Sequence, residues 1–213
     1  MMFEIEYKGG STVVLSTKNT TVVADPKTSL VGLKDTNTKD AIELGTEVRF
    51  LVNNPDAKLV IEGPGEYEIG DFSLSGVPAQ RHIDTEDQEK LATVYRIGVG
   101  EVHIALLGNI APKLTEDELE AIGVIDILVL PVGGGGYTLD ATSAATIVRQ
   151  IEPKVVIPVH YADSALTYEV PQDTLDTFTK ELGAPVEEGG SKYKVKSAGA
   201  IPQSLTVITL ARS

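Results

Sequence analysis

The feature that most constrains this fold is a change in the pattern of apolar residues in the second half of the chain. Earlier runs, such as residues 3–7 and 12–15, are short and alternating or β-branched, which is typical of antiparallel strands joined by tight turns. Two later runs, 127–130 and 155–159, are continuously apolar and flank a helical segment at 140–151. Continuous apolar runs indicate strands buried on both faces. The sequence therefore predicts an α+β fold, with two packed sheets and helices outside.

Charge and composition narrow the classes of function. The chain has 213 residues, a formal net charge of −13 and no cysteine. Binding to nucleic acid or to anionic membrane draws its affinity from clustered Lys and Arg, so neither partner is expected. The lack of cysteine excludes thiolate catalysis, disulfides and iron–sulfur ligation.

The same sequence gives expectations about location and domain organisation. The acidic amino terminus does not read as a secretion signal, and the most apolar stretch is too short to span a membrane. We therefore expect a soluble, cytoplasmic protein. No linker rich in Pro, Ser or Gly divides the chain, so a single domain over residues 1–213 is predicted. The oligomeric state cannot be read from this pattern.

Several further elements bear on where a site could lie. Residues 27–40 lack periodicity and predict a long loop, and residues 48–52 predict a strand that ends at Asn53 and Asn54. Thr115 and Glu118 form a capping-box pattern, which predicts a helix that begins there. A later helix, opened by Pro171 and closed by Gly183, and a last strand pair complete the chain; the pair consists of residues 192–195 and 205–210.

The three histidines are the first candidates for chemistry. His160 directly follows the buried run 155–159, at the carboxyl end of a strand, where α/β proteins place their sites. His82 ends another predicted strand, whereas His103 lies inside one and is interpreted as a strand-face residue. Five serines are considered as nucleophiles, and none of them lies in a GxSxG or SxxK motif, so they give serine catalysis no sequence support: Ser16, Ser29, Ser75, Ser143 and Ser164.

Segments spread along the chain are similar to one known family. The string from Asp126 to Gly134 and the string from Glu152 to Tyr161 resemble the second half of the metallo-β-lactamase superfamily, in particular its branch of Zn-dependent hydrolases. Asp25-Pro26 and Gly108-Asn109 resemble earlier motifs of that branch, and the similarity covers about residues 3–165. The resemblance implies a four-layer αββα sandwich with a site on the loops at one edge of the sheets.

The departures from the family pattern concern its metal ligands. Members with two zinc ions carry His-x-His-x-Asp-His after a strand that the resemblance matches to residues 48–52, where this chain has Asn53 to Lys58 and no histidine. Asn109 stands where the family has a metal-bridging aspartate. The resemblance leaves only His82 and His160 of the ligand set, and catalytic zinc ordinarily has three protein ligands. No metal cofactor is therefore expected.

Three hypotheses about function follow. The first is a non-catalytic relative whose old cleft binds a small-molecule ligand. The second is a single-metal hydrolase of a phosphoester, lactone or amide, in which His82, His160 and an acid such as Asp25 or Asp163 hold zinc or another divalent ion. The third is a metal-free acid–base enzyme that uses His160 with Asp163 or Tyr161. The candidate cleft residues are Asp25, His82, Asn109, His160, Tyr161 and Asp163.

Overall fold

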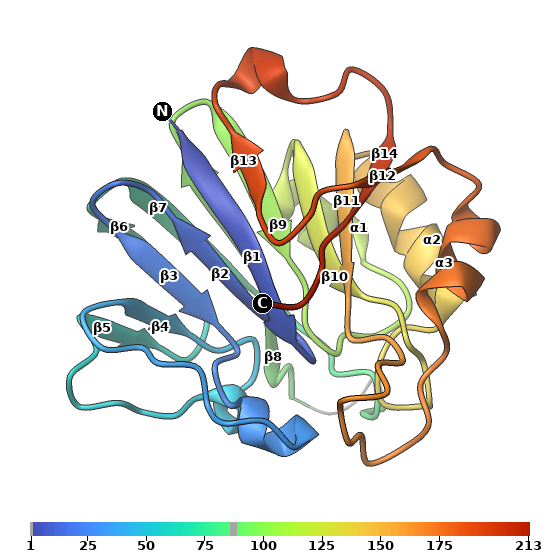
Figure 1. Ribbon diagram of the computed structural model, residues 1–213, viewed down its shortest axis with the longest axis horizontal. Helices are drawn as coiled ribbons and strands as arrows, with labels where there is room; N and C mark the ends of the chain where they lie inside the picture. Colours follow the sequence, from blue (N-terminus) through green and yellow to red (C-terminus); the bar gives the residue numbers. More distant parts are fainter. Residues whose placement is uncertain (1, 86–88) are drawn as a thin grey trace.

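The computed structural model, which describes residues 2–85 and 89–213, consists of two sheets packed face to face (Figure 1). The six-stranded sheet has the order β13 (Tyr193–Val195), β1 (Phe3–Gly9), β2 (Thr12–Ser16), β3 (Thr21–Ala24), β4 (Ile42–Leu44), β5 (Leu59–Ile61). The eight-stranded sheet has the order β12 (Val186–Glu188), β14 (Thr206–Thr209), β11 (Val155–Val159), β10 (Ile127–Pro131), β9 (Val102–Leu106), β8 (Ala92–Val99), β7 (Phe72–Ala79), β6 (Gly65–Ile69). The two-sheet architecture predicted from the sequence is confirmed.

Strand β10 shows why its sequence is continuously apolar. Ile127 and Val129 belong to the core between the two sheets, whereas Leu128 and Leu130 belong to a second core beneath the helices. Successive side chains of a strand point to opposite faces, so both sets must be apolar. β10 pairs in parallel with β9 and β11, which brings the carboxyl ends of these strands to one edge.

Three α-helices of the described residues cover the outer face of the eight-stranded sheet (Figure 1): α1 (Glu116–Ile122), α2 (Ala141–Ile151) and α3 (Leu175–Leu182). The capping box of α1 is confirmed, because Thr115 Oγ1 accepts from the Glu118 amide at 3.2 Å and Glu118 Oε2 accepts from the Thr115 amide at 2.9 Å. Short 3₁₀ turns are η1 (Thr28–Val31), η2 (Val48–Phe50) and η3 (Ala198–Ala200). No helix in the described part of the chain is long and apolar enough to cross a membrane.

Two sequence predictions about strands are wrong. Residues 48–52 are not a strand, since they form η2 and an extended segment after it. The strand in this part of the chain is β4, which comes before these residues, has only three residues and was missed because Glu43 lies in its middle. The last two predicted strands also do not pair with each other. β13 pairs with β1 in one sheet and β14 with β11 in the other.

Glu43 explains why the chain after η2 is not a strand. Its side chain is fully buried and accepts hydrogen bonds from the amides of Val52, Asn53 and Asn54 at 2.6, 2.7 and 3.2 Å, and from Thr38 Oγ1 at 2.9 Å. These amides therefore bond to a carboxylate in place of a neighbouring strand.

We expect Glu43→Gln to lower the free energy of unfolding by about 2 kcal/mol, because an amide in place of one carboxylate oxygen leaves a buried donor without an acceptor. Chemical denaturation measures the change. Glu62→Gln is the matched control, because Glu62 is exposed, and it should stay within about 0.5 kcal/mol of the wild type. Equal stability of the two variants would show that the Glu43 hydrogen bonds do not hold the segment.

Candidate ligand cleft

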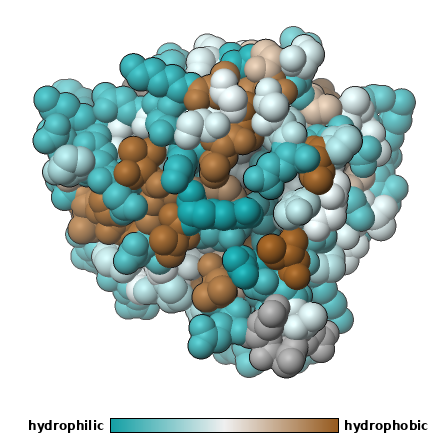
Figure 2. Space-filling model, turned by 90° about the horizontal axis from the view of Figure 1, so that it is seen from below, coloured by the Kyte–Doolittle hydropathy of each residue, from teal (hydrophilic) through white to brown (hydrophobic). Residues whose placement is uncertain are grey.

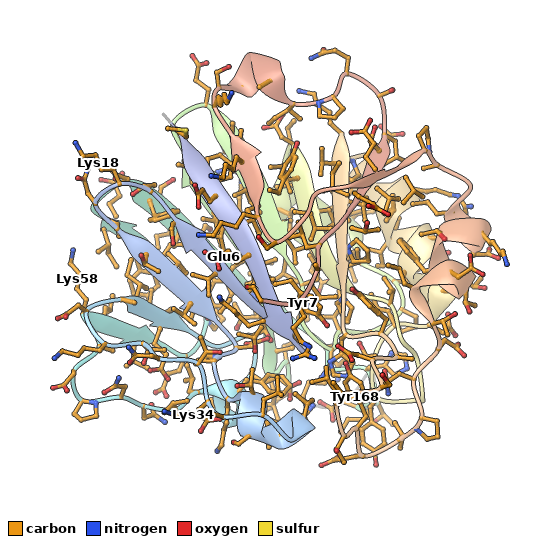
Figure 3. All side chains as sticks on the ribbon, in the orientation of Figure 1. Glu6, Tyr7, Lys18, Lys34, Lys58 and Tyr168 are labelled. Atoms are coloured by element: carbon orange, nitrogen blue, oxygen red, sulfur yellow. The ribbon has the colours of Figure 1, made fainter. Side chains whose placement is uncertain are left out.

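Loops from both sheets meet at one edge of the sandwich and enclose a cavity of about 180 Å³. The loop after β11 supplies most of one wall, and Tyr168 of that loop is labelled in Figure 3. Figure 2 views this edge from below and shows apolar groups beside polar ones, and the side chains of Leu30 and Tyr137 are exposed here. The cavity is lined by Leu30, Val31, Arg49, Phe50, Asn109, Tyr137, His160, Tyr168, Glu169, Val170 and Gln172.

His160 lines this cavity as a neutral imidazole. It has a left-handed backbone, with φ of 51°, and its amide donates to the Gly10 carbonyl at 2.7 Å. Its Nδ1 is hydrogen-bonded to Ser11 Oγ at 2.9 Å, and its ring centre lies 4.9 Å from that of Tyr168. Burial lowers the pKa of His160 to about 4, and the positive charge of Arg49 acts in the same direction.

Asp25 lies behind the cavity, where it anchors the loop after β4. Its two carboxylate oxygens accept from the amide and from Oγ1 of Thr46, each at 2.7 Å. Burial raises the pKa of Asp25 to about 7, although both hydrogen bonds from Thr46 act against this rise. Together with Ser11 and His160 it borders a second void of only about 20 Å³.

A buried acid and two arginines form an ion-pair cluster beside the cavity. Arg49 Nε lies 3.0 Å from Glu47 Oε2, and Arg49 Nη2 donates to Oε1 at 3.1 Å, which makes the pair bidentate. Arg81 Nη1 lies 3.9 Å from the same carboxylate, and the amide nitrogen of Asn109 donates to it at 3.5 Å. Burial raises the pKa of Glu47 although Arg49 and Arg81 lower it. The Arg49 guanidinium also stacks 4.7 Å from the centre of the Phe50 ring.

Sequence reasoning missed Glu47, Arg49 and Arg81. The wrongly predicted strand at 48–52 put Arg49 inside a strand, so its place in a loop was not visible. Ser11 was missed as well, because it follows a glycine turn and lies 149 residues from His160. The one available signal was the pair of opposite charges at Glu47 and Arg49.

The remaining predicted site residues lie at varying distances from the cavity. The amide of His82 donates to the Asn109 carbonyl at 2.8 Å, and its Nδ1 lies 3.3 Å from the Ile110 carbonyl oxygen. Tyr161 packs against Tyr7, with ring centres 5.8 Å apart. The structure thus places His160 and Asn109 on the cavity wall, and Asp25, His82 and Tyr161 outside that wall.

Asp163 makes its contacts away from the main cavity. Its carboxylate accepts from the Ala165 amide at 2.9 Å and from Arg212 Nε at 2.8 Å. These two bonds lower the pKa of Asp163. Among the described residues Asp163 forms no hydrogen bond with His160, so the two are not an acid–base pair in this structure.

The residues at this edge do not fit a divalent cation. Within residues 2–85 and 89–213, no three His, Asp or Glu side chains lie together so that they could hold a metal ion. Both oxygens of Asp25 are engaged by Thr46. A guanidinium beside Glu47 adds positive charge where a metal site needs negative charge.

Comparison with known proteins gives a family and a fold. Residues 4–160 match the family described as "Beta-lactamase superfamily domain". A protein of Archaeoglobus fulgidus named "UPF0173 metal-dependent hydrolase" is 26% identical over 117 residues, which are 51% of this chain and 49% of that protein. A UPF0173 protein of Pyrococcus furiosus is 31% identical over 124 residues, 57% of this chain and 51% of that protein. The alignments thus span about half the length of these relatives.

Solved structures show the same fold over almost the whole chain. A Thermotoga maritima protein of the metallo-β-lactamase superfamily superposes with a TM-score of 0.75 at 22% identity, covering 99% of this chain and 100% of that one. A metallo hydrolase of Ignicoccus hospitalis superposes with a TM-score of 0.65 at 17% identity, covering 86% of this chain and 91% of that one. The expected sandwich is therefore confirmed.

Proposed function

Because this chain belongs to the β-lactamase superfamily, we propose that it keeps the family's sandwich around a cleft that binds a small molecule without a metal ion and without hydrolysis. The observation that carries this proposal is the bidentate Glu47–Arg49 pair at the cavity. A buried carboxylate paired with a guanidinium has its lone pairs and its charge already satisfied. It therefore does not act as a metal ligand.

The chemistry of hydrolysis supports the same proposal. Hydrolytic members of a metal-dependent family need the ion to lower the pKa of a bound water towards 7. The neutral His160 is a weak base, and Asp163 is not in contact with it. Among the described residues, the cavity wall thus offers groups that can bind a ligand but no cluster of side chains that could hold a metal ion.

A second candidate function is a hydrolase with a single metal ion. It is favoured by the words "metal-dependent hydrolase" in the name of the Archaeoglobus fulgidus relative. It would use the Nε2 atoms of His82 and His160 with a carboxylate, while the Nδ1 atoms keep their present hydrogen bonds.

Elemental analysis of protein purified without chelator or affinity metal separates the two candidates. We expect less than about 0.1 equivalent of zinc, manganese or iron per chain, since fewer than three ligands converge. A screen of phosphoester, lactone and amide substrates should show no turnover, with and without added zinc. Near-stoichiometric metal that disappears in His160→Ala, together with turnover, would establish the hydrolase and contradict the proposal.

A further inference from the structure

Strand β6 has an open edge that lacks the usual protection. Among the described residues it pairs only with β7, at the end of the eight-stranded sheet (Figure 1). It has five residues, whereas β5, β12 and β13, which lie at the other three sheet ends, have three each. Proteins commonly shorten an exposed edge or place Lys or Pro on it, because a bare edge pairs with other chains. Residues 65–69 contain neither Lys nor Pro, so this edge is available to another strand.

The hydrogen-bond pattern of the hairpin leaves main-chain groups of Glu66 and Glu68 at the open edge. β6 and β7 pair with Ile69 opposite Phe72, and the turn between them has two residues, with Gly70 in a left-handed conformation. The residues that flank such a turn are hydrogen-bonded to each other, and hydrogen-bonded and non-hydrogen-bonded pairs then alternate along the ladder. Glu66 and Glu68 lie in the non-hydrogen-bonded pairs. Their N–H and C=O groups therefore point away from β7.

The two faces of β6 differ in chemistry. Tyr67 and Ile69 are half-buried and pack against the core between the two sheets. Glu66 and Glu68 are exposed on the opposite face, where they line a hollow of about 370 Å³. The side chains of a strand point alternately to its two faces. A strand added here would thus place every second side chain beside the acids, and the others beside the apolar residues.

The charge of this edge selects its occupant. Glu66 and Glu68 form no ion pair with the described residues. Arg96, the cation in the wall of the hollow, lies two strands from Glu66, about 10 Å between Cα atoms. Opposite charges on neighbouring strands stabilise pairing, and like charges destabilise it. A second copy of β6 paired here would set glutamates against glutamates, whereas a basic strand would neutralise them.

We propose that β6 binds an extended segment of a partner protein, in which Lys or Arg alternates with apolar residues, by antiparallel strand addition. The antiparallel direction continues the pattern of β6, β7, β8 and β9. The basic residues lie opposite Glu66 and Glu68 and exchange main-chain hydrogen bonds with them. The apolar residues cover Tyr67 and Ile69 at the rim of the core. This surface shares no lining residue with the cleft, so the inference goes beyond the proposed function and does not depend on it.

A synthetic peptide of alternating Lys and Val, acetylated and amidated at its ends, is the probe, titrated into the full chain by calorimetry. We expect a Kd on the order of 100 μM at low ionic strength. The same peptide N-methylated at every Lys keeps its charges and apolar groups but cannot donate to β6. It should therefore bind at least about tenfold more weakly. Equal binding of the two peptides would show that only the net charge of −13 attracts them, and would overturn the proposal.

Variants of β6 locate the binding. Glu66→Gln combined with Glu68→Gln should weaken the peptide about fivefold, as expected for two exposed ion pairs. The matched control combines Glu120→Gln with Glu181→Gln, because these two acids are exposed on α1 and α3, and it should change the Kd by less than about twofold. Glu68→Pro removes an N–H that faces away from β7, so the hairpin keeps its own hydrogen bonds. This variant should bind no detectable peptide.

Several outcomes would contradict the proposal. They are no binding of the alternating peptide, equal effects of the two double variants, and unchanged binding to Glu68→Pro. If Glu68→Pro does not fold, the N-methylated peptide carries that part of the test. Self-association of the free chain that Glu66→Gln with Glu68→Gln strengthens, measured by analytical ultracentrifugation, would assign the edge to a second copy and also overturn it. The metal-free cleft is tested separately by the elemental analysis.

Discussion

Between pH 4.5 and 6.5 the Asp25→Asn and His160→Asn variants are expected to change stability in opposite directions relative to the wild type. The Asp25→Asn variant should become more stable, relative to the wild type, by about 1.4 kcal/mol per pH unit as the pH rises. The His160→Asn variant should lose about the same amount per unit. Over the full interval each change amounts to about 3 kcal/mol.

The sign for Asp25 follows from its raised pKa. Its pKa is about 7 in the folded protein and about 3.9 in the unfolded chain. Between these values the folded state holds a proton that the unfolded state has released, so the contribution of Asp25 to stability falls as the pH rises. Asn cannot titrate, and the fall disappears in the variant.

His160 has the opposite sign because its pKa is lowered. Its pKa is about 4 in the folded protein and about 6.5 in the unfolded chain. Between these values only the unfolded state binds the proton, so its contribution to stability rises with pH. Asn is the chosen replacement because it tolerates the left-handed backbone of residue 160.

Urea denaturation at several pH values measures these slopes. Comparison with the wild type cancels the carboxylates that all three proteins share. If the stabilities of the two variants changed with pH in the same way, this would contradict the burial of a protonated Asp25 and a neutral His160. If the difference in stability between one variant and the wild type did not change with pH, the group replaced in that variant would be the exposed one.

The Gly133→Ala variant is expected to lose about 3 kcal/mol of the free energy of unfolding. An added Cβ would overlap the carbonyl oxygen of His160 and the side chain of Gln172. The His160 carbonyl belongs to the backbone and cannot rotate away, because the amide of that residue is bonded to Gly10. The variant must therefore separate the loops after β10 and β11.

Thermal or chemical denaturation measures the effect of Gly133→Ala. Gly199→Ala is the matched control, since open space surrounds Gly199, and it should change stability by less than about 0.5 kcal/mol. A Gly133→Ala variant as stable as that control would mean that the two loops do not pack as described.

The fold could be predicted from long, continuous patterns. The signals were local ones. A few neighbouring residues determine the apolar runs that form β10 and β11, and the same is true of the cap at Thr115. β4 could not be predicted in this way. It is three residues long, and its central Glu43 is buried because it bonds the amides of a segment about ten residues later.

The site could be predicted only in part, for the same reason. The position of His160 could be predicted because this residue follows the continuously apolar run 155–159, which clearly indicates a strand. The Glu47–Arg49 pair depends on the loop after β4, so the error at residues 48–52 concealed it. The Ser11–His160 contact joins residues 149 positions apart, and no local pattern encodes it.

A crystal structure of the protein grown with excess zinc tests the central claim most directly. The account predicts an intact bidentate Glu47–Arg49 pair, His160 still bonded to Ser11, and no cation within ligand distance of His82 or His160. One or two fully occupied cations bound by those histidines, with Arg49 displaced from Glu47, would contradict it.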